Sequence, residues 1–554
     1  MRIAFILAAA ILLYGTYYEA VAALIGCVLL VLLLHRTVTE KKLILPKSLF
    51  LWAVILLPVF ALISVPFSID KGMAGLGFVK MLPAALFCLV ISFEEKETKE
   101  KCLQSVPLVA VVITAVGLLS KFTPYREMFY IQDRFSGNFQ YANSYALFLL
   151  VSVVILLYSK KDPWTRAALS LFLLYGIWET GSRSIGLLAL AAFAVWCMSL
   201  TGRKKYFVLA VPAGVFALAA AGVFMGSRWG DFNLLSSSFV SRLFYNYDGI
   251  KMVLSHPLGL GYKGFLFYQG AVQTANYSST YAHNELLQAA LDFGWIPAIL
   301  LLAGGCIALF KKRISARNRC LIAVIFIHSL FDWDMQFTAL LMILTLVIEL
   351  DTDKKEVSVT GAGKAAAAAA GSFAIAACLW LGTAAYFEYI GNYETAAKVY
   401  SGLTTSQMQM INSAADSEQF ALAKSICSRN DYCVIALQAM AEKSFKEGNI
   451  KEMEGYAMKA VRAGKYSAEA YEFYIMAMNG AFRALLDNGD RESAYAVLQY
   501  INKIPDLINQ TEEQTSPYAK YLYNKTEIRL DKQYMNYLQD VHSLIENDIP
   551  VGNN

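Results

Sequence analysis

The sequence predicts an all-α fold: a polytopic membrane helical bundle of about 12–13 spans, with a large outward loop and a C-terminal helical-repeat domain. Three observations predict it. Hydrophobic residues make up 57% and charged residues only 16% of the 554 residues, which is more apolar surface than globular domains of this size bury. Apolar runs near the ~20 residues that cross a bilayer recur up to Tyr386. Beyond Tyr386 the composition changes to amphipathic helices with Ala and Tyr at helical spacing.

The charge pattern favours a membrane setting over nucleic acid. The formal net charge of +5 is small for this length, and the basic residues form short clusters between apolar runs. Nucleic acid would require one continuous basic face. We therefore expect membrane lipids, and no nucleic acid, among the partners.

The first apolar run is interpreted as a spanning helix. A removable signal would lead into a polar segment, whereas this chain turns at YGTYYE and immediately re-enters an apolar run. Near the end of the bundle, Cys320–Leu350 is too long for one helix and is expected to be split into a hairpin by the polar notch Phe331–Asp334. The other predicted spans are Ile3–Tyr17, Ala20–Leu34, Leu49–Phe67, Gly75–Phe93, Ser105–Ser120, Ser144–Tyr158, Ala167–Trp178, Ile185–Leu200, Tyr206–Met225, Trp295–Phe310 and Lys364–Tyr386.

Positive charge predicts the orientation of these spans. Every second connection is rich in Lys and Arg and is therefore assigned to the cytoplasm, together with the N-terminus. The alternate connections, among them 68–71, 121–141, 180–184 and 226–294, are poorer in positive charge and are expected to face outward. The basic connections contain Arg36, Lys41, Lys42 and Lys47; Lys96, Lys99 and Lys101; Lys160, Lys161 and Arg166; Arg203, Lys204 and Lys205; Lys311, Lys312, Arg313, Arg317 and Arg319; and Lys354 and Lys355.

This pattern divides the chain into four parts. They are the N-terminal membrane helices 1–225, an outward catalytic loop 226–294, the C-terminal membrane helices 295–389, and an extracytoplasmic domain 390–554. The last part resembles tetratricopeptide repeats, and an unrelated helical bundle is the alternative. Its two cysteines, Cys427 and Cys433, are expected to be either a disulfide in an oxidising exterior or two unlinked thiols.

Three ionisable residues on the outward side are candidates for chemistry. Arg183 lies in the tight turn ETGSRS, where a guanidinium offers several donors to phosphate oxygens; a snorkelling arginine is the alternative. Arg242 opens a predicted helix in the outward loop, with a surface salt bridge to Asp248 as the alternative. His283 is followed by the polar residues Asn284 and Glu285, and a neutral imidazole accepts a proton near neutral pH. A structural histidine is its alternative.

No metal motif is recognised in the outward loops, apart from the pair in Asp332-Trp333-Asp334, which we expect to form a polar turn that caps two helices. His328 and Asp332 are four residues apart and are expected to hydrogen-bond on one helix face. Lys80, near the outer end of its span, is expected to snorkel or to contact a lipid phosphate. We predict that the protein uses neither a metal nor a cofactor.

Several short motifs together carry a resemblance. Arg134–Asn143 reads RFSGNFQYAN, similar to an outward R-x-S-G-x-F-x-x-x-N segment; it is followed by Ser182-Arg183, by Arg242 ahead of the segment HPLGLG, and by HNELLQ from His283. Over about residues 40 to 350 the chain resembles the O-antigen ligase and O-antigen polymerase superfamily of bacterial envelope glycosyltransferases. The domain beyond the spans departs from typical lipopolysaccharide ligases, which end soon after their last membrane helices.

The resemblance implies transfer of a glycan from undecaprenyl diphosphate to an acceptor hydroxyl at the outer face of the membrane, without metal and with inversion. It implies that Arg183 and Arg242 bind the diphosphate and that His283 activates a lipid, glycan or protein acceptor. The further residues expected to bind substrate are Arg134, Asn143 and Asn284.

Two other function classes stay open. One is a transporter or flippase of polyprenyl-linked glycans, although transporters tend to have paired halves and no internal repeat is recognised among these spans. The other is a membrane anchor for a protein-binding tail, for which so many spans are unnecessary. Within the enzyme class, ligation of a block and polymerisation of repeats require the same donor site and differ only in the acceptor.

Overall fold

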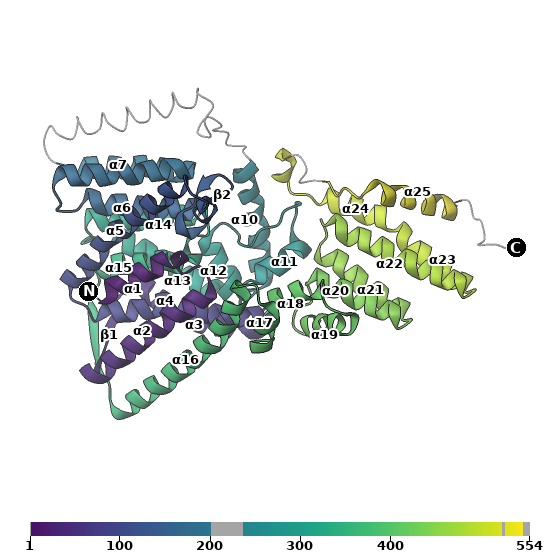
Figure 1. Cartoon of the computed structure of the whole chain (residues 1–554), viewed down its shortest axis with the longest axis horizontal. Coiled ribbons are helices and arrows are strands. Elements are labelled where there is room, and N and C mark those ends of the chain that lie inside the picture. Colours follow the sequence, from purple (N-terminus) through teal and green to yellow (C-terminus); the bar gives the residue numbers. More distant parts are fainter. Residues whose placement is uncertain (1, 201–236, 523–526, 547–554) are drawn as a thin grey trace, which may run out of the picture. The chain divides into compact units, whose positions relative to one another are not determined.

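The structure is a computed structural model that describes residues 2–200, 237–522 and 527–546 (Figure 1). Within these residues it is almost entirely helical, with two short two-stranded sheets, so the all-α prediction is confirmed. The predicted span at Tyr206–Met225 lies outside the described residues. The chain forms two compact units, which are described in turn.

The first unit contains the described residues of Met1–Ser64, Gly75–Asn233 and Ala282–Gly391. Five of the described helices are long and apolar enough to cross a membrane, and five shorter ones are also apolar, so the protein is a multi-pass membrane protein. The helices of this unit are α1 (Arg2–Leu12), α2 (Glu19–Glu40), α3 (Leu49–Ser64), α4 (Lys71–Ser92, from Gly75 onward), α5 (Lys96–Ser120), α6 (Ala142–Leu157), α7 (Pro163–Thr180), α8 (Arg183–Ser199), α12 (Glu285–Phe293), α13 (Trp295–Phe310), α14 (Ala316–Ser329), α15 (Thr338–Glu349) and α16 (Gly361–Tyr389).

Burial distinguishes the inner helices of this unit from the outer ones. Helices α6 and α15 are buried along almost their whole length, and α4 is largely buried. Helices α2, α5 and α16 have large apolar side chains that are exposed, among them Leu24, Val112 and Leu379. A helix that is apolar on its exposed face suits lipid as its surroundings. Helices α2 and α16 pack closely at Gly382. A Cβ at this position would lie only 2.4 Å from the Cβ of Ala23, so the contact requires a glycine.

Connections assigned to the same side of the membrane contact one another. Among the connections predicted to be cytoplasmic, β1 (Lys42–Pro46) pairs antiparallel with β4 (Lys354–Ser358), and Arg317 binds Glu100 with two bonds of 2.7 Å. Among the connections predicted to face outward, Lys121 lies 2.6 Å from Glu179. These contacts agree with the predicted alternation. The second sheet, β2 (Tyr130–Ile131) with β3 (Arg134–Phe135), is also in an outward connection.

The predicted notch also forms. Helix α14 ends at Ser329, a short 3-10 helix covers Asp334–Gln336, and α15 begins at Thr338. The long apolar run is therefore a helical hairpin, as expected.

The second unit contains the described residues of Val65–Ala74, Leu234–Tyr281 and Asn392–Asn554. Small Ala and large Tyr side chains share its main core, among them Ala457, Ala470, Tyr471 and Tyr474. Cys427 and Cys433 are both free thiols. The helices of this unit are α10 (Ser237–Ser255), α11 (Gly264–Val272), α17 (Tyr393–Val399), α18 (Thr404–Ile411), α19 (Asp416–Cys427), α20 (Val434–Lys446), α21 (Ile450–Ala463), α22 (Ala468–Asp487), α23 (Arg491–Asn502), α24 (Ile504–Glu513) and α25 (Lys532–Glu546) (Figure 1).

Part of the outward loop is built into this second unit. The Lys465 amide donates to the Gly270 carbonyl at 3.2 Å, and the Ser516 amide donates to the Thr274 carbonyl at 2.7 Å. A Cβ on Gly270 would lie 2.2 Å from the carbonyl oxygen of Ala463, so α11 and α21 are in close contact. The loop segment and the C-terminal helices therefore form one packed body.

Candidate functional site

Two buried aspartates in the notch organise one end of the first unit, the end that the sequence predicts to face outward. The side chains of Asp332 and Asp334 are 1% and 0% exposed. Each pairs with a histidine: His283 Nδ1 lies 3.1 Å from Asp332 Oδ1, and His328 Nδ1 lies 2.7 Å from Asp334 Oδ2. A buried carboxylate requires hydrogen-bond partners, and each imidazole supplies one.

The first turn of α6 holds both aspartates in place. Asn143 Nδ2 donates to Asp332 Oδ2 at 2.8 Å, and Ser144 Oγ donates to Asp334 Oδ1 at 2.8 Å. Neighbouring residues of one helix thus bind neighbouring carboxylates of one turn. The notch is more than the polar turn that the sequence suggested, because it joins α6 to two histidines.

His328 pairs with Asp334 rather than with the expected Asp332. The expectation assumed that the helix continues through Asp332, so that the two side chains would share one face. Helix α14 ends at Ser329, and the turn that follows brings Asp334 to the imidazole instead.

His283 has an unusual backbone. Its φ is +54°, in the left-handed region, where a residue other than Gly costs on the order of 1–2 kcal/mol. The Asn284 side chain accepts the Leu287 amide at 3.1 Å and so caps α12, which starts immediately afterwards. The imidazole is 19% exposed. Because Asp332 binds Nδ1, Nε2 is the ring atom suited to take a proton from a partner.

Three of the residues predicted from the sequence are connected through Asp332. Arg134 Nη2 donates to Asn143 Oδ1 at 2.7 Å, and its Nε donates to the Thr180 carbonyl at 2.9 Å. Asn143 binds Asp332, which binds His283. Arg134, Asn143 and His283 therefore belong to one hydrogen-bonded network.

Aromatic rings surround this network. Tyr141 Oη donates to Asp332 Oδ1 at 2.8 Å, and its ring centroid lies 4.2 Å from that of Trp333. Trp333 also lies edge-on to His283, at 6.5 Å. Such rings are suited to line a site that binds a sugar face or an isoprenoid chain.

Arg183 is the first residue of α8. The turn before it is made by Gly181, whose φ is +61°, and Arg183 is partly exposed. The next residue, Ser184, places its Oγ 3.2 Å from His328 Nε2. Arg183 therefore directly precedes a residue that contacts the second aspartate–histidine pair.

Arg242 lies in the second unit, on α10, whereas Arg134, Asn143, Arg183, His283 and Asn284 lie in the first. Asp248, its alternative salt-bridge partner, is not a surface residue. Both oxygens of the Asp248 carboxylate accept hydrogen bonds from Thr274, each at 2.8 Å, and Tyr277 Oη adds a third at 3.1 Å. Burial raises the pKa of Asp248.

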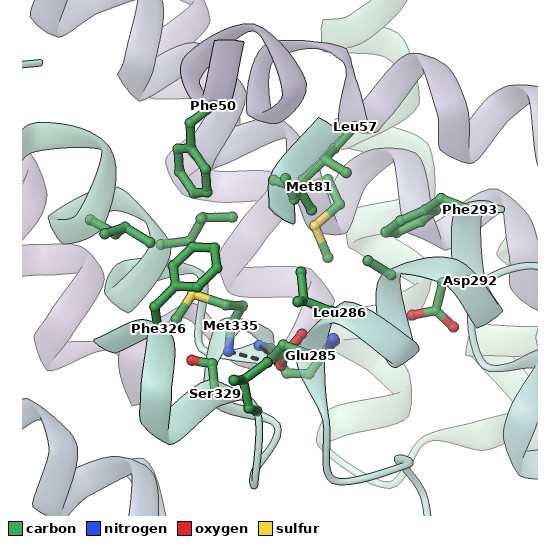
Figure 2. A pocket seen from close by; sticks show the side chains of 16 residues that line it. Phe50, Leu57, Met81, Glu285, Leu286, Asp292, Phe293, Phe326, Ser329 and Met335 are labelled. Atoms are coloured by element: carbon green, nitrogen blue, oxygen red, sulfur yellow. Dashed lines mark hydrogen bonds between the residues drawn. The ribbon is translucent and has the colours of Figure 1, made fainter. Parts of the chain in front are cut away.

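A cavity of about 60 Å³ lies beside the start of α12 (Figure 2). Glu285 lines it and accepts the amides of Met335 and Gln336 at 2.9 and 3.2 Å, which ties the segment after His283 to the notch. Burial, followed by the charge of Asp334, raises the pKa of Glu285 to about 8. Burial also raises the pKa of Asp292. The other lining residues are mostly apolar, among them Phe50, Met81, Leu286, Phe293 and Phe326.

Lys80 does not snorkel. Its side chain is fully buried, donates to the carbonyls of Thr16 and Tyr17, and lies 4.8 Å from the centre of the Tyr17 ring.

Sequence reasoning missed Asp332 as the partner of His283, and Tyr141 and Ser144 as residues that hold the aspartates. One signal was present: the pair of aspartates in an outward turn is matched by two histidines at outward positions. A buried carboxylate requires partners, and the imidazoles were the nearest candidates. Among the described residues, no group of three or more His, Cys, Asp and Glu side chains is arranged to hold a metal ion.

Comparison with known proteins found one matched segment, which contains part of this site. Residues 167–303, about a quarter of the chain, match the model of a family described as O-Antigen ligase. The segment contains Arg183, Arg242 and His283. None of the curated proteins matches the chain. The match indicates a membrane protein with a role in glycan ligation or polymerisation.

Proposed function

We propose that the protein transfers a glycan from undecaprenyl diphosphate to an acceptor hydroxyl at the outer face of the cytoplasmic membrane, as a metal-independent, inverting glycosyltransferase. The observation that carries the proposal is the His283–Asp332 pair, at 3.1 Å, within a network that also includes Arg134 and Asn143. The match of residues 167–303 to the O-antigen ligase family supports the class of reaction.

His283 is the general base of this proposal. Nε2 takes the proton of the acceptor hydroxyl, while the hydroxyl oxygen forms a bond to the anomeric carbon of the donor sugar. The bond from that carbon to the diphosphate oxygen breaks, and the diphosphate leaves with the electron pair. Attack from the opposite face inverts the anomeric centre. Asp332 stabilises the imidazolium that forms, and its own bonds to Tyr141 and Asn143 keep it oriented.

Arg183 and Arg242 bind the diphosphate and stabilise the charge that grows on it as it leaves. Two guanidinium groups supply the positive charge that the leaving group needs. In this proposal the substrate is also bound by the side chains of Arg134, Asn143 and Asn284. They also keep the base in place. Arg134 donates to Asn143, which donates to Asp332, and Asn284 caps the helix that follows His283.

In this proposal the acceptor binds on the outward side of the membrane, where we also assign the C-terminal domain.

The length of the product distinguishes polymerisation from ligation. A ladder of repeats on a gel indicates a polymerase, and transfer of a single block indicates a ligase.

The test is incubation of the purified protein with undecaprenyl-diphosphate glycan and candidate acceptors, including the donor itself. His283→Ala is expected to abolish transfer while membrane insertion is kept. His542→Ala is the matched control, because His542 is exposed on α25 and its imidazole contacts Asn502 and Glu546, which lie in the C-terminal helices. Transfer that persists in His283→Ala removes the base role. Movement of lipid-linked glycan across vesicles without any transfer favours the transporter class instead.

A further inference from the structure

The second aspartate–histidine pair has no part in the proposed reaction, yet it contacts Ser184, a residue that is partly exposed. Ser184 Oγ lies 3.2 Å from His328 Nε2, and His328 Nδ1 lies 2.7 Å from Asp334 Oδ2. His328 and Asp334 are buried, whereas Ser184 is partly exposed and directly follows Arg183. Of these three residues only Ser184 is not buried, so Ser184 is the one that is open to a ligand.

The hydrogen positions follow from counting donors and acceptors. Asp334 receives Ser144 Oγ at 2.8 Å, Ser329 Oγ at 3.3 Å and the His328 imidazole. A carboxylate with three such donors acts as an acceptor only, so His328 Nδ1 carries the hydrogen. We assign the neutral form to His328, in which the other nitrogen is an acceptor.

Ser184 must therefore donate its single hydroxyl hydrogen to His328 Nε2. The Ser184 oxygen then has only its two lone pairs left, and these can accept hydrogen bonds. Ser182 Oγ, at 3.5 Å, is at the limit of hydrogen bonding and satisfies at most one of them. Ser184 thus presents an acceptor beside Arg183, which presents only donors.

We propose that Ser184 accepts a hydrogen bond from a hydroxyl or amide N–H of the sugar attached to the donor diphosphate. The proposal rests on the function proposed above, in which Arg183 binds the diphosphate. Phosphate oxygens are acceptors and do not bond to a lone pair. The neighbouring ligand group that carries donors is the first sugar. Ser184 is then a residue that selects the sugar, and His328 and Asp334 are positioning residues that fix the direction of its hydroxyl.

The experiment uses the full-length protein in lipid nanodiscs and two probes. One is undecaprenyl diphosphate without sugar, and the other is undecaprenyl diphosphate that carries one N-acetylhexosamine. The wild type is expected to bind the sugar-bearing lipid more tightly. Ser184→Ala is expected to weaken binding of the sugar-bearing lipid by roughly 2- to 10-fold, the range of one neutral hydrogen bond, and to leave binding of the bare lipid unchanged.

Two further variants separate this role from a structural one. Ser184→Thr keeps the hydroxyl and is expected to retain the preference for the sugar-bearing lipid. His328→Asn keeps a donor for Asp334 but lacks Nε2, and it is expected to reproduce the loss. If His328 acts through Ser184, the double variant loses no more than either single one. Ser152→Ala is the control, because Ser152 is a buried serine whose hydroxyl bonds its own helix, to the Phe148 carbonyl at 2.9 Å.

The outcomes are distinguishable. The inference is overturned if Ser184→Ala weakens both lipids equally or neither, or if the wild type binds both lipids equally. Arg183→Ala tests the underlying function separately, since it should weaken both lipids. If Arg183→Ala has no effect on the bare lipid, or if the wild type binds neither lipid, the proposed diphosphate site fails and the inference fails with it.

Discussion

Asp332→Asn is the sharpest perturbation of the proposed base. Oδ1 of Asp332 receives three donors, from Tyr141, His283 and the Trp333 amide, at 2.8, 3.1 and 3.0 Å. The amide oxygen of the introduced asparagine would therefore stay at this position, which leaves its NH₂ group facing Asn143 Nδ2, a second donor. Asn143 cannot relieve the clash by turning its amide, because its Oδ1 accepts Arg134 Nη2 at 2.7 Å.

The expected cost has two parts. Loss of the negative charge removes stabilisation of the imidazolium, for which general-base catalysis sets a scale of about 10²- to 10⁴-fold in kcat, or about 3–5 kcal/mol. The opposed donors lower the free energy of unfolding by about 1–3 kcal/mol. The loss of kcat and the loss of stability both result from replacing one carboxylate oxygen by an NH₂ group, and the two are measured separately.

The assay is the initial rate of glycan transfer by purified variants at saturating donor, with thermal unfolding followed in parallel. A Ser152→Ala variant serves as control for the loss of a buried hydrogen bond on α6. A kcat for Asp332→Asn within about threefold of the wild type, in a folded protein, would refute the role of the pair, because such a change is far below the general-base scale.

Two other predictions concern pH and the second unit. The pKa of Glu285 rises from 4.5 in the unfolded chain to about 8 in the fold. The folded state therefore holds an extra proton between these values, so stability falls as the pH rises from 4.5 to about 8 and levels off above that pH. Glu285→Gln is expected to flatten the change in Tm between pH 5 and 9, and a variant with the wild-type slope would contradict the assignment. Gly270→Ala is expected to lower the Tm and the transfer rate, because its Cβ would meet the Ala463 carbonyl at 2.2 Å, whereas Gly455→Ala, with nothing within 4 Å, is expected to be neutral or to stabilise by about 0.5–1 kcal/mol. Equal effects of the two alanines would exclude close packing of α11 on α21.

The sequence predicts the fold class well because hydrophobicity over twenty residues is a strong signal and because basic clusters mark alternate connections. The hairpin at the notch follows from the same reasoning. The pairing of β1 with β4 does not, since two five-residue strands about 300 residues apart carry no pattern that identifies them as partners.

The candidate site is predictable in part. Arg134, Asn143 and His283 were selected by motif, and they share one network. Their connection through Asp332 depends on the exact end of α14, and element ends are the least reliable part of a sequence-based assignment. The same uncertainty gave His328 the wrong aspartate. The left-handed backbone of His283 has no sequence signal at all, because no glycine marks it.

The packing of the outward loop against the C-terminal helices was also beyond what the sequence could predict. Composition changes sharply at Tyr386, and this favoured a separate tail domain. The contacts of Gly270 and Thr274 with Lys465 and Ser516 depend on the meeting of two surfaces that are far apart in the chain.

The joining of the outward loop to the C-terminal helices has a consequence for biosynthesis. A growing chain is made from its N-terminus at about 5–20 residues per second, so Thr274 leaves the ribosome roughly 10–50 s before Ser516 exists. During that interval the loop lacks the surface on which it packs. A chain cut short by premature termination would insert its membrane helices and still leave the loop unsupported, so only completed translation products would become active.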